Sequence, residues 1–380
     1  MSHDFIVIGA GIAGASAACE LARHGKVALL EREDRPGYHS TGRSAAFYTL
    51  NYGNEIIRTL TDLSGDFFRD PPDGFAESPL IVRHATVTIA RADQEASFRD
   101  NLRAARASAG RIDELDPAAA ERLIPILRPG YAAFAHLEPD SYFMDVALIH
   151  GGFLKSLAAR GGRLVCGAEV GGLKRARDAW RVTTKAGAFE APVVVNAAGA
   201  WADDIARLAG AAPAGLQPMR RTAIIVAAPA GIDIAACPLV IDTDEQFYFR
   251  PEAGKVLASP ADETPSVPCD AQPEEADVAV TVDRLERATT LSVRRVEHRW
   301  AGLRSFVADR APVVGPDPAA EGFVWLAGQG GYGIMTSPAM ARAAAALAAG
   351  SAWPAELSTR GITPARLAPG RASLAATVRA

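Results

Sequence analysis

The N-terminal segment combines a short apolar run, a glycine-rich turn and a helical pattern. Residues 4–8 (DFIVI) predict a strand that is buried on both faces. The segment Ile12–Ala22 is rich in alanine and leucine, which favours a helix, and Gly25 provides a C-terminal stop. A second apolar run, Val27–Leu30, ends at Glu31. Together these features predict one βαβ unit with two parallel strands.

The same kind of pattern returns in the middle and near the end of the chain. We expect the recurring pieces to form one discontinuous domain with the N-terminal unit. They comprise a helix over Phe143–Arg160, short strands at 163–166, 179–184 and 190–196, and a strand over Gly322–Ala327 that leads into an alanine-rich helix through Ala349.

The intervening segments have a different character. Residues 81–90 and 222–258 alternate apolar with polar positions, which is typical of strands. The proline- and acid-rich stretch 261–276 predicts a surface loop. We therefore expect an α/β protein with a Rossmann-like domain and a second, β-sheet-based domain. The predicted first domain comprises 1–80, 143–210 and 309–370, and the predicted second domain comprises 81–142 and 211–308.

Composition excludes several classes of partner. The formal net charge of −4 gives no general attraction to nucleic acid. The four cysteines are far apart and form no CxxC pair, which argues against a zinc site or a redox dithiol. No apolar run approaches the roughly 20 residues that span a bilayer. We expect a cytoplasmic protein without an integral membrane segment, with a peripheral position at the inner membrane left open.

The turn after the first strand, GAGIAG, matches the GxGxxG pattern of dinucleotide-binding folds. Gly9 would permit the tight turn, Gly11 would let the backbone approach a pyrophosphate, and Gly14 would allow close helix–strand packing. The helix N-terminus would attract the phosphates. Glu31 would accept both hydroxyl hydrogens of a ribose, which disfavours NADP. A strand before the turn and a helix after it make the motif specific.

Two further segments favour FAD over NAD as the dinucleotide. The stretch after Glu31 contains a turn of small residues at 42–45, which suits backbone that passes close to a flat ring system. The glycine run at 330–333 opens a helix whose N-terminus could face the N1–C2=O edge of a flavin and stabilise its reduced anion. An NAD-dependent Rossmann dehydrogenase remains the alternative outside flavoenzymes.

Longer motifs connect the chain to a known family. ERE, RPGYHSTGRSAA, VVVNAAGAWAD and QGGYGI occur in this order, and LQPMRR and WAGLRSFVAD lie between the last two. With these motifs the chain resembles the D-amino-acid oxidase-type superfamily of FAD enzymes, whose folds include those of glycine and sarcosine oxidases. Within it, the chain is most similar to bacterial FAD-dependent D-amino acid dehydrogenases of the D-arginine dehydrogenase type. The likeness extends over nearly the whole chain.

The resemblance implies a set of FAD-binding residues. Covalent sarcosine oxidases attach their flavin through a cysteine in the C-terminal part, and this chain has no cysteine after Cys269, so noncovalent FAD is expected. The implied residues are Gly9, Gly11, Ile12, Ala13, Gly14, Glu31, Arg32, Ser40, Thr41, Ser44, Ala45, Val170, Ala198, Gly199, Trp201, Arg304, Gly331, Tyr332, Gly333 and Ile334.

The resemblance also implies how a substrate would be held. Arg304 matches the family's carboxylate-binding arginine, and a guanidinium binds a carboxylate through two parallel charge-assisted bonds. Arg221, Tyr52 and Tyr248 match positions that complete the anion pocket, and the carbonyl of Gly331 would accept from the substrate amine. Residue patterns alone leave simpler roles open: Arg304 could pair with Asp309, Arg220-Arg221 could be a solvated pair, and the tyrosines could be half-buried strand residues.

The chain departs from arginine-using relatives at the expected substrate pocket. Those relatives have a glutamate where Thr86 stands, a histidine where Phe47 stands and a glutamine where Met335 stands. Without the glutamate a substrate guanidinium would lack an opposite charge. We therefore expect neutral or apolar D-amino acids as substrates. Asp242 is expected on the surface, with the alternative that it restores an acid to the pocket. The expected pocket residues are Phe47, Thr49, Thr86, Leu239, Ile241 and Met335.

The expected reaction is oxidative deamination. Hydride would pass from Cα to flavin N5, and the imine would hydrolyse to a 2-oxo acid and ammonia, without a histidine base. The main alternative is a glycine or sarcosine-type amino acid oxidase that uses O2. A 2-hydroxy acid oxidase and a non-catalytic flavin-binding protein are weaker alternatives. The electron acceptor, which could be a quinone, a protein or O2, does not follow from the sequence.

Overall fold

The computed structural model describes residues 2–108 and 110–375, which contain two large sheets. The six-stranded sheet includes the N-terminal strand, and its pairs are parallel except for the β20–β21 pair. Its strand order is β20 (Val313–Pro316), β21 (Phe323–Ala327), β13 (Val193–Asn196), β1 (Phe5–Ile8), β2 (Val27–Leu30) and β9 (Arg163–Val165).

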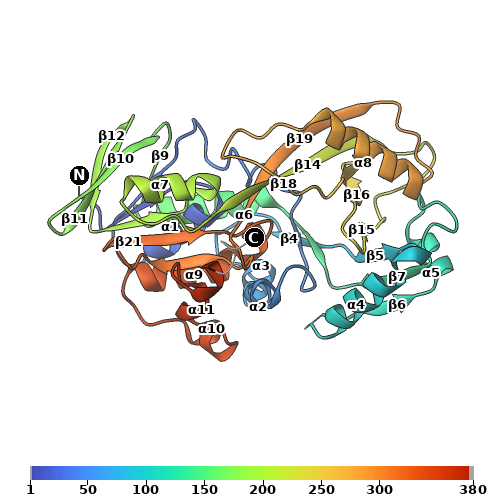
Figure 1. Cartoon of the computed structure of the whole chain (residues 1–380), viewed down its shortest axis with the longest axis horizontal. Coiled ribbons are helices and arrows are strands. Elements are labelled where there is room, and N and C mark those ends of the chain that lie inside the picture. Colours follow the sequence, from blue (N-terminus) through green and yellow to red (C-terminus); the bar gives the residue numbers. More distant parts are fainter. Residues whose placement is uncertain (1, 109, 376–380) are drawn as a thin grey trace.

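Helices cover one face of this sheet, and residues from 173–191 and 202–206 pack on the other, which is why its central strands are apolar on both faces. Helix α1 (Ile12–Leu21) packs against α9 (Gly333–Ala348) and α6 (Val146–Ala159). All four residues of β1 and of β2 are buried. A separate three-stranded sheet lies at the end of the molecule near the N-terminus (Figure 1). It consists of β10 (Val170–Ala176), β11 (Ala179–Thr184) and β12 (Gly187–Ala191).

The nine-stranded sheet forms the other half of the molecule (Figure 1). Helix α8 (Glu275–Ala288) packs on β14 and β17, and α4 (Glu95–Arg106) packs on β5 and β7. The strand order is β18 (Thr264–Pro265), β14 (Gln217–Ala227), β17 (Lys255–Ser259), β16 (Tyr248–Glu252), β15 (Leu239–Asp242), β5 (Thr86–Ala90), β7 (Phe134–Glu138) and β6 (Asp113–Leu115), with β19 (Val296–Phe306) paired to β14.

A small sheet connects segments from both predicted domains, whose division stays a prediction. In it β8 (Tyr142–Met144) lies between β3 (Phe47–Tyr48) and β4 (Ile81–Arg83). The remaining elements are α2 (Glu55–Asp62), α3 (Gly65–Arg69), η1 (Ala92–Gln94), α5 (Pro117–Leu123), η2 (Gly199–Trp201), α7 (Ala202–Leu208), α10 (Ala355–Thr359), α11 (Pro364–Leu367) and α12 (Ala372–Ala375).

The predicted α/β fold class is confirmed, but some predicted elements are wrong. Phe143 is not the start of a helix: it pairs with Phe47 in the small sheet, and α6 begins after Asp145, whose side chain accepts from the Leu148 N–H. The stretch 261–276 is more than a surface loop. It contains β18, which pairs with β14, and the first residues of α8. Its tertiary pairing overrides the turn-forming composition.

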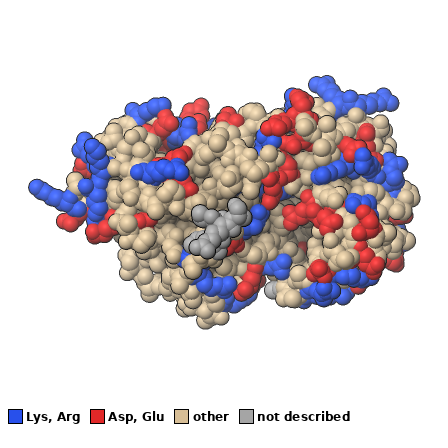
Figure 2. Space-filling model, viewed as in Figure 1, with Lys and Arg blue, Asp and Glu red and all other residues tan. Residues whose placement is uncertain are grey.

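Charged side chains of both signs are interspersed over the face shown in Figure 2, and uncharged residues cover much of its middle. In the described ranges 2–108 and 110–375, no helix combines the length and the apolar character that crossing a bilayer requires.

Candidate active site

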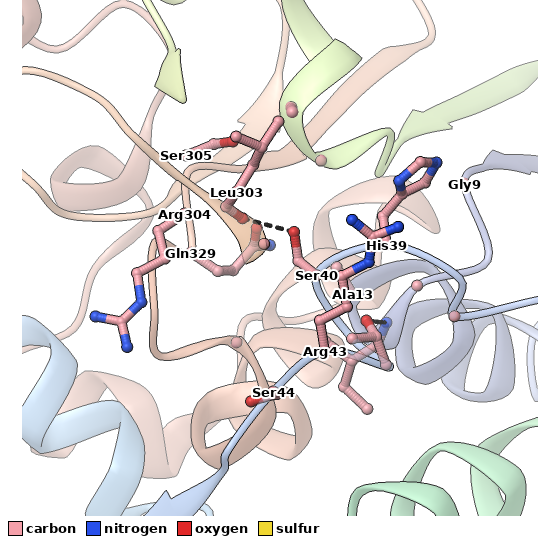
Figure 3. Close-up of a pocket in the computed structure, with 18 of the residues that line it drawn as sticks. Gly9, Ala13, His39, Ser40, Arg43, Ser44, Leu303, Arg304, Ser305 and Gln329 are labelled. Carbon is pink, nitrogen blue, oxygen red and sulfur yellow. Dashed lines mark hydrogen bonds between the residues drawn. The ribbon is translucent and has the colours of Figure 1, made fainter. Parts of the chain in front are cut away.

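A cavity of about 380 Å³ lies along the carboxyl ends of β1 and β2 and extends to β19. Its wall includes Glu31 after β2, Trp201 before α7 and Arg304 on β19. Figure 3 shows that the Arg304 side chain extends away from the region where Ser40 approaches the Leu303 carbonyl. The cavity therefore joins the glycine turn to the partly buried guanidinium of Arg304.

The glycine turn can form only with glycine at two positions. Gly9 has φ +97°, and a Cβ there would lie 2.5 Å from the Ala197 carbonyl oxygen. A Cβ on Gly14 would lie 1.8 Å from the carbonyl oxygen of Gly9. These contacts bring the start of α1, whose first-turn N–H groups have no partner within the helix, close to the cavity.

Glu31 is held in one orientation at this end. One carboxylate oxygen accepts from the Ala10 N–H at 2.8 Å, and the other accepts from the Glu33 N–H at 3.0 Å. The side chain is 7% exposed and lines the cavity. A carboxylate fixed by two backbone donors keeps further acceptor capacity for hydroxyl groups.

The loop after Glu31 is attached to both sides of the cavity. The Thr41 hydroxyl accepts from the Ile12 N–H at 2.9 Å, which joins the loop to the start of α1. The Ser40 hydroxyl donates to the Leu303 carbonyl at 2.5 Å, and the Trp300 indole donates to the Arg43 carbonyl at 2.9 Å. The small residues of this loop therefore lie between α1 and β19.

The glycine-rich loop before α9 packs against Arg304. The Gly330 N–H donates to the Ser305 carbonyl at 3.0 Å, which attaches the loop to β19. A Cβ on Gly331 would lie 2.8 Å from Cζ of Arg304. A side chain at position 331 would therefore displace the guanidinium.

Arg304 is surrounded by tyrosine hydroxyls instead of acids. Its Nη1 donates to the Tyr52 hydroxyl at 2.9 Å, and Tyr248 also lines this end of the cavity. Among the described residues, none of the acidic side chains pairs with Arg304. Burial alone would lower the pKa of Arg304, but Tyr52 and Tyr248 hold it above the ordinary value. The Arg304 guanidinium is therefore permanently charged, and an anionic ligand can serve as its counter-ion.

Arg221 and Arg220 lie on opposite faces of β14 and have different partners. Arg221 lines the cavity, where its Nε donates to the Asp262 carbonyl at 2.7 Å and its Nη2 lies 3.4 Å from Glu263. Arg220 pairs with Glu274 and Asp277 on the other face. Neither is a solvated charge, and the positive charge of Arg221 is already partly neutralised.

The predicted Arg304–Asp309 pair, an alternative to the anion pocket, does not form. Asp309 instead accepts two hydrogen bonds from Arg371, at 2.7 and 2.8 Å. Burial raises the pKa of Asp309, but the bonds from Arg371 and Ser373 outweigh it and lower that pKa to about 2. Asp242, expected on the surface, is fully buried and accepts from Gln94, because its strand β15 lies inside the sheet.

Most residues that the sequence singled out line the cavity. The lining residues among them are Gly9, Gly11, Ile12, Ala13, Glu31, Arg32, Ser40, Thr41, Ser44, Ala45, Phe47, Tyr52, Val170, Ala198, Gly199, Trp201, Arg221, Tyr248, Arg304, Gly331, Gly333, Ile334 and Met335.

Four expected pocket residues do not line the cavity. The Thr86 hydroxyl bonds to Ser141 at 2.8 Å, and the Thr49 hydroxyl lies 2.7 Å from each carboxyl oxygen of Glu138. Leu239 is 1% exposed inside the nine-stranded sheet. Ile241, on the same strand, is not part of the cavity wall either. Family positions identified these residues, but the local packing of this chain turns them towards other partners.

Two expected FAD residues also lie behind the wall. Gly14 contacts the backbone of Gly9, where its role is packing. Tyr332 is 7% exposed, and its ring lies edge-on to that of Tyr52 with centroids 4.9 Å apart. Burial, and to a smaller extent the nearby Tyr52, raises the pKa of Tyr332 to about 12. Tyr332 therefore supports Tyr52 from behind.

Many residues of the wall were not predicted from the sequence as site residues, among them Arg43, Trp300 and Gln329. Gln329 is the most informative, because its buried side-chain nitrogen has no hydrogen-bond partner among the described residues. An unsatisfied buried donor in a cavity wall is typical of a site that takes a polar ligand. Gln329 is the first residue of the QGGYGI motif. A polar side chain next to the glycine run was the feature of the sequence that could have identified it as a ligand-binding residue.

These features fit a flavin dinucleotide. The glycine turn with Glu31 suits a pyrophosphate and a ribose, and the unpartnered Gln329 amide suits a polar ring edge. Among the described residues, groups of three or more acidic, histidine or cysteine side chains that could bind a metal ion do not occur.

Comparisons with known proteins agree with this reading of the cavity. Residues 4–347 match the family model "FAD dependent oxidoreductase" (DAO). The chain is 30% identical over 361 residues to the tRNA 5-methylaminomethyl-2-thiouridine biosynthesis bifunctional protein MnmC of Burkholderia ambifaria, with 83% of this chain and 48% of the relative covered. The chain therefore spans about half the length of this relative.

Two solved structures share the fold. Glycine oxidase from Geobacillus kaustophilus matches with a TM-score of 0.81 and 21% identity, and 95% of this chain and 98% of that chain are covered. FAD-bound L-alpha-glycerophosphate oxidase from Mycoplasma pneumoniae matches with a TM-score of 0.82 and 17% identity, with 92% and 95% covered. The predicted cofactor FAD is confirmed by the family match, and the NAD alternative is wrong. The chain belongs to the DAO family of FAD-dependent oxidoreductases.

Proposed function

We propose that this enzyme oxidises the Cα–N bond of D-amino acids with neutral or apolar side chains and yields 2-oxo acids and ammonia. The observation that carries the proposal is the guanidinium of Arg304, which lines the cavity beside the Tyr52 hydroxyl and has no acidic partner among the described residues. A partly buried cation without a counter-ion is stabilised when an anion binds to it. An amino acid supplies that anion as its carboxylate.

Arg304 would bind the carboxylate by two parallel bonds, while Tyr52 holds the guanidinium and donates its own hydrogen to the ligand. Tyr248 would complete this pocket. Arg221 would contribute a weaker attraction, because Asp262 and Glu263 already occupy part of its donor capacity. The Gly331 carbonyl would accept from the substrate amine. These contacts would fix the orientation of Cα.

Bound FAD supplies the oxidising chemistry, as the acceptor of a hydride from Cα. The residues of the chain bind and orient the substrate and exclude water. Of the described residues in the wall, the single histidine is His39, whose ring bonds to Glu33 at 2.9 Å and lies 4.7 Å from that of Trp201. His39 is therefore at the dinucleotide end, and selection of the neutral amine from solution replaces a histidine base in the proposal.

The preference for uncharged side chains rests on the wall near Arg304. Phe47 and Met335 line this end, and the ring of Phe47 stacks on that of Tyr52 with centroids 5.8 Å apart. The acidic residues of the described wall are Glu31, Glu169 and Asp204, which belong to the dinucleotide end. A substrate guanidinium would thus lose its hydration without an ion pair.

FAD binding in the proposal is noncovalent, because the described cysteines do not line the cavity. The residues proposed to hold FAD are those predicted from the sequence that line the cavity, from Gly9 to Ile334, with Gln329 added. Gly14 and Tyr332 would act through packing.

The test is anaerobic reduction of the purified yellow protein by a panel of D- and L-amino acids. We expect D-Leu, D-Met or D-Phe to bleach the flavin, with a higher kcat/KM than D-Arg or D-Lys. Reduction by L-amino acids alone, or a large advantage of D-Arg, would contradict the proposed specificity. Failure of every amino acid to bleach the flavin would contradict the reaction itself.

A glycine or sarcosine-type amino acid oxidase is the second candidate, because the same anion pocket would bind these smaller substrates. It differs in the acceptor, which would be O2 in place of a quinone or a protein. Stoichiometric hydrogen peroxide from glycine or sarcosine in air would favour it over the D-amino acid dehydrogenase.

A further inference from the structure

Glu138 is a buried carboxyl that the proposed reaction does not use. It is the last residue of β7, and its side chain is 3% exposed. Burial raises the pKa of Glu138, and hydrogen bonds from Thr49 and Leu50 only partly oppose that rise. Burying a carboxyl group costs free energy unless hydrogen bonds replace its lost hydration. The groups that bond to Glu138 therefore indicate what its burial achieves.

The partners of Glu138 are in the turn that follows β3. The Thr49 hydroxyl lies 2.7 Å from both carboxyl oxygens, and the Leu50 N–H donates to one of them at 3.3 Å. Thr49 in turn accepts from the Asn51 N–H at 3.0 Å. The Glu138 carboxyl, which is far from this turn in sequence, therefore bonds to Thr49 and Leu50 directly and to Asn51 through Thr49.

The next residue in the turn is Tyr52, whose hydroxyl accepts from Arg304 at 2.9 Å. Beyond it, Gly53 has φ +83°, and Asn54 begins α2 by accepting from the Ile57 N–H. Tyr52 thus lies between an anchored helix start and the segment that Glu138 holds. Without Glu138, the side before Tyr52 would lose its attachment to β7 and keep only the long-range bond that the Ser108 hydroxyl donates to the Asn51 side chain.

We infer that Glu138 is a positioning residue, which acts through the 49–51 turn to hold the Tyr52 hydroxyl against Arg304 and so sets the affinity for the substrate carboxylate. The inference rests on the proposed function, since it assigns a task within the same anion pocket. It also explains why Thr49 is turned away from the cavity: its hydroxyl connects Glu138 to the turn.

The test measures carboxylate binding in FAD-loaded protein by calorimetry, with 4-methyl-2-oxopentanoate, the 2-oxo acid of leucine, as the probe. We expect Glu138→Leu to raise the dissociation constant about tenfold, as for other coupled neighbours. Glu138→Gln, which keeps an acceptor for Thr49 and Leu50, should restore most of the affinity. KM for the amino acid should rise with the dissociation constant, while kcat changes less.

A double-mutant cycle separates positioning from general damage. In a Tyr52→Phe background the further effect of Glu138→Leu on the dissociation constant should disappear, because both changes remove one linkage. Asp317→Ala is the matched control. Asp317 is also buried, and its carboxylate accepts from the backbone N–H groups of Ala319 and Ala320, where Glu138 accepts from one, but it lies beside β20. This variant should lose stability without a change in carboxylate affinity.

Thr49→Val tests the same link from the other side and covers the case in which Glu138→Leu does not fold. Hydrogen exchange at the Leu50 amide should become faster in either variant. Full additivity of Glu138→Leu and Tyr52→Phe, or unchanged affinity in Thr49→Val, would overturn the inference. If wild-type protein neither binds the probe nor is bleached by any amino acid, the proposed function fails instead, which is a distinct result.

Discussion

The two large sheets build their ends of the cavity in different ways. The six-stranded sheet is an apolar scaffold: β1 and β2 are buried and apolar throughout, and the loops beyond them contribute backbone groups and one fixed carboxylate, Glu31. The nine-stranded sheet buries polar side chains within its own strands. They include Thr86, Thr88, His136, Glu138, Arg221 and Asp242.

This difference predicts two kinds of sensitivity to mutation. At the six-stranded sheet a change acts mainly through backbone clashes, because the ligand-facing groups belong to the main chain. At the nine-stranded sheet it acts through loss of a single polar side chain or through burial of an unsatisfied one. The following variants test the contrast, from the largest expected effect to the smallest.

Arg304→Met should lower kcat/KM for the best amino acid by about 10²- to 10³-fold, because loss of one partner of a buried ion pair costs about 2–5 kcal/mol. Most of the bound FAD should remain, as judged by visible absorbance per mole of protein, because the other residues proposed to hold it are unchanged. Arg304→Lys should recover part of the activity, since it keeps the charge but not the planar fork. Unimpaired turnover in Arg304→Met would remove the basis of the substrate end.

His136 should make the nine-stranded sheet sensitive to acid. Both of its ring nitrogens lack hydrogen-bond partners among the described residues, and burial, assisted by Arg106, lowers its pKa from 6.5 to about 4. Between these pH values the unfolded chain binds more protons than the folded one, so stability falls as the pH falls from 6.5 towards 4. The contribution of His136 to this loss is about 3 kcal/mol.

His136→Leu should abolish the contribution of His136 to the pH dependence of the free energy of unfolding. The measurement is the free energy of unfolding in urea at several pH values between 4 and 7. The variant and the wild type should differ most at pH 4 and least at pH 7. Parallel curves for the two proteins would contradict the assignment.

Gly14→Ala should reduce FAD binding by about tenfold or more, because overpacking costs about 1–3 kcal/mol and the new Cβ would lie 1.8 Å from the Gly9 carbonyl oxygen. The measurement is the dissociation constant of FAD from protein refolded without it. Gly151→Ala is the control: a Cβ there meets nothing within 4 Å. Equal FAD affinity in both variants would show that the turn tolerates the extra carbon.

Arg221→Met should have the smallest effect, about tenfold or less on kcat/KM, because Asp262 and Glu263 already occupy its guanidinium. The effect should appear mainly in KM. A loss as large as that of Arg304→Met would mean that the substrate displaces Glu263 and uses both arginines equally.

The dinucleotide end was predictable because its determinants are local. Gly9, Gly14 and Glu31 lie within one βαβ unit, where spacing fixes geometry, and the family motifs that follow extended the assignment along the loop to Ala45. Phe143 shows the limit of this reasoning even for secondary structure. Its apolar pattern suits a helix, but pairing with Phe47 places it in a strand.

The substrate end needed the tertiary structure. The sequence contained Arg304, Tyr52 and Gly331, but only folding shows that Arg304 bonds to Tyr52 and that Asp309 belongs to Arg371. Likewise Thr49, expected in the pocket, faces Glu138. Which partner a polar side chain takes depends on strands brought together from distant segments, and such long-range choices leave no periodic signal along the chain. The sequence by itself therefore determined the cofactor fold, whereas the tertiary structure alone decided which charges remain free to meet a ligand.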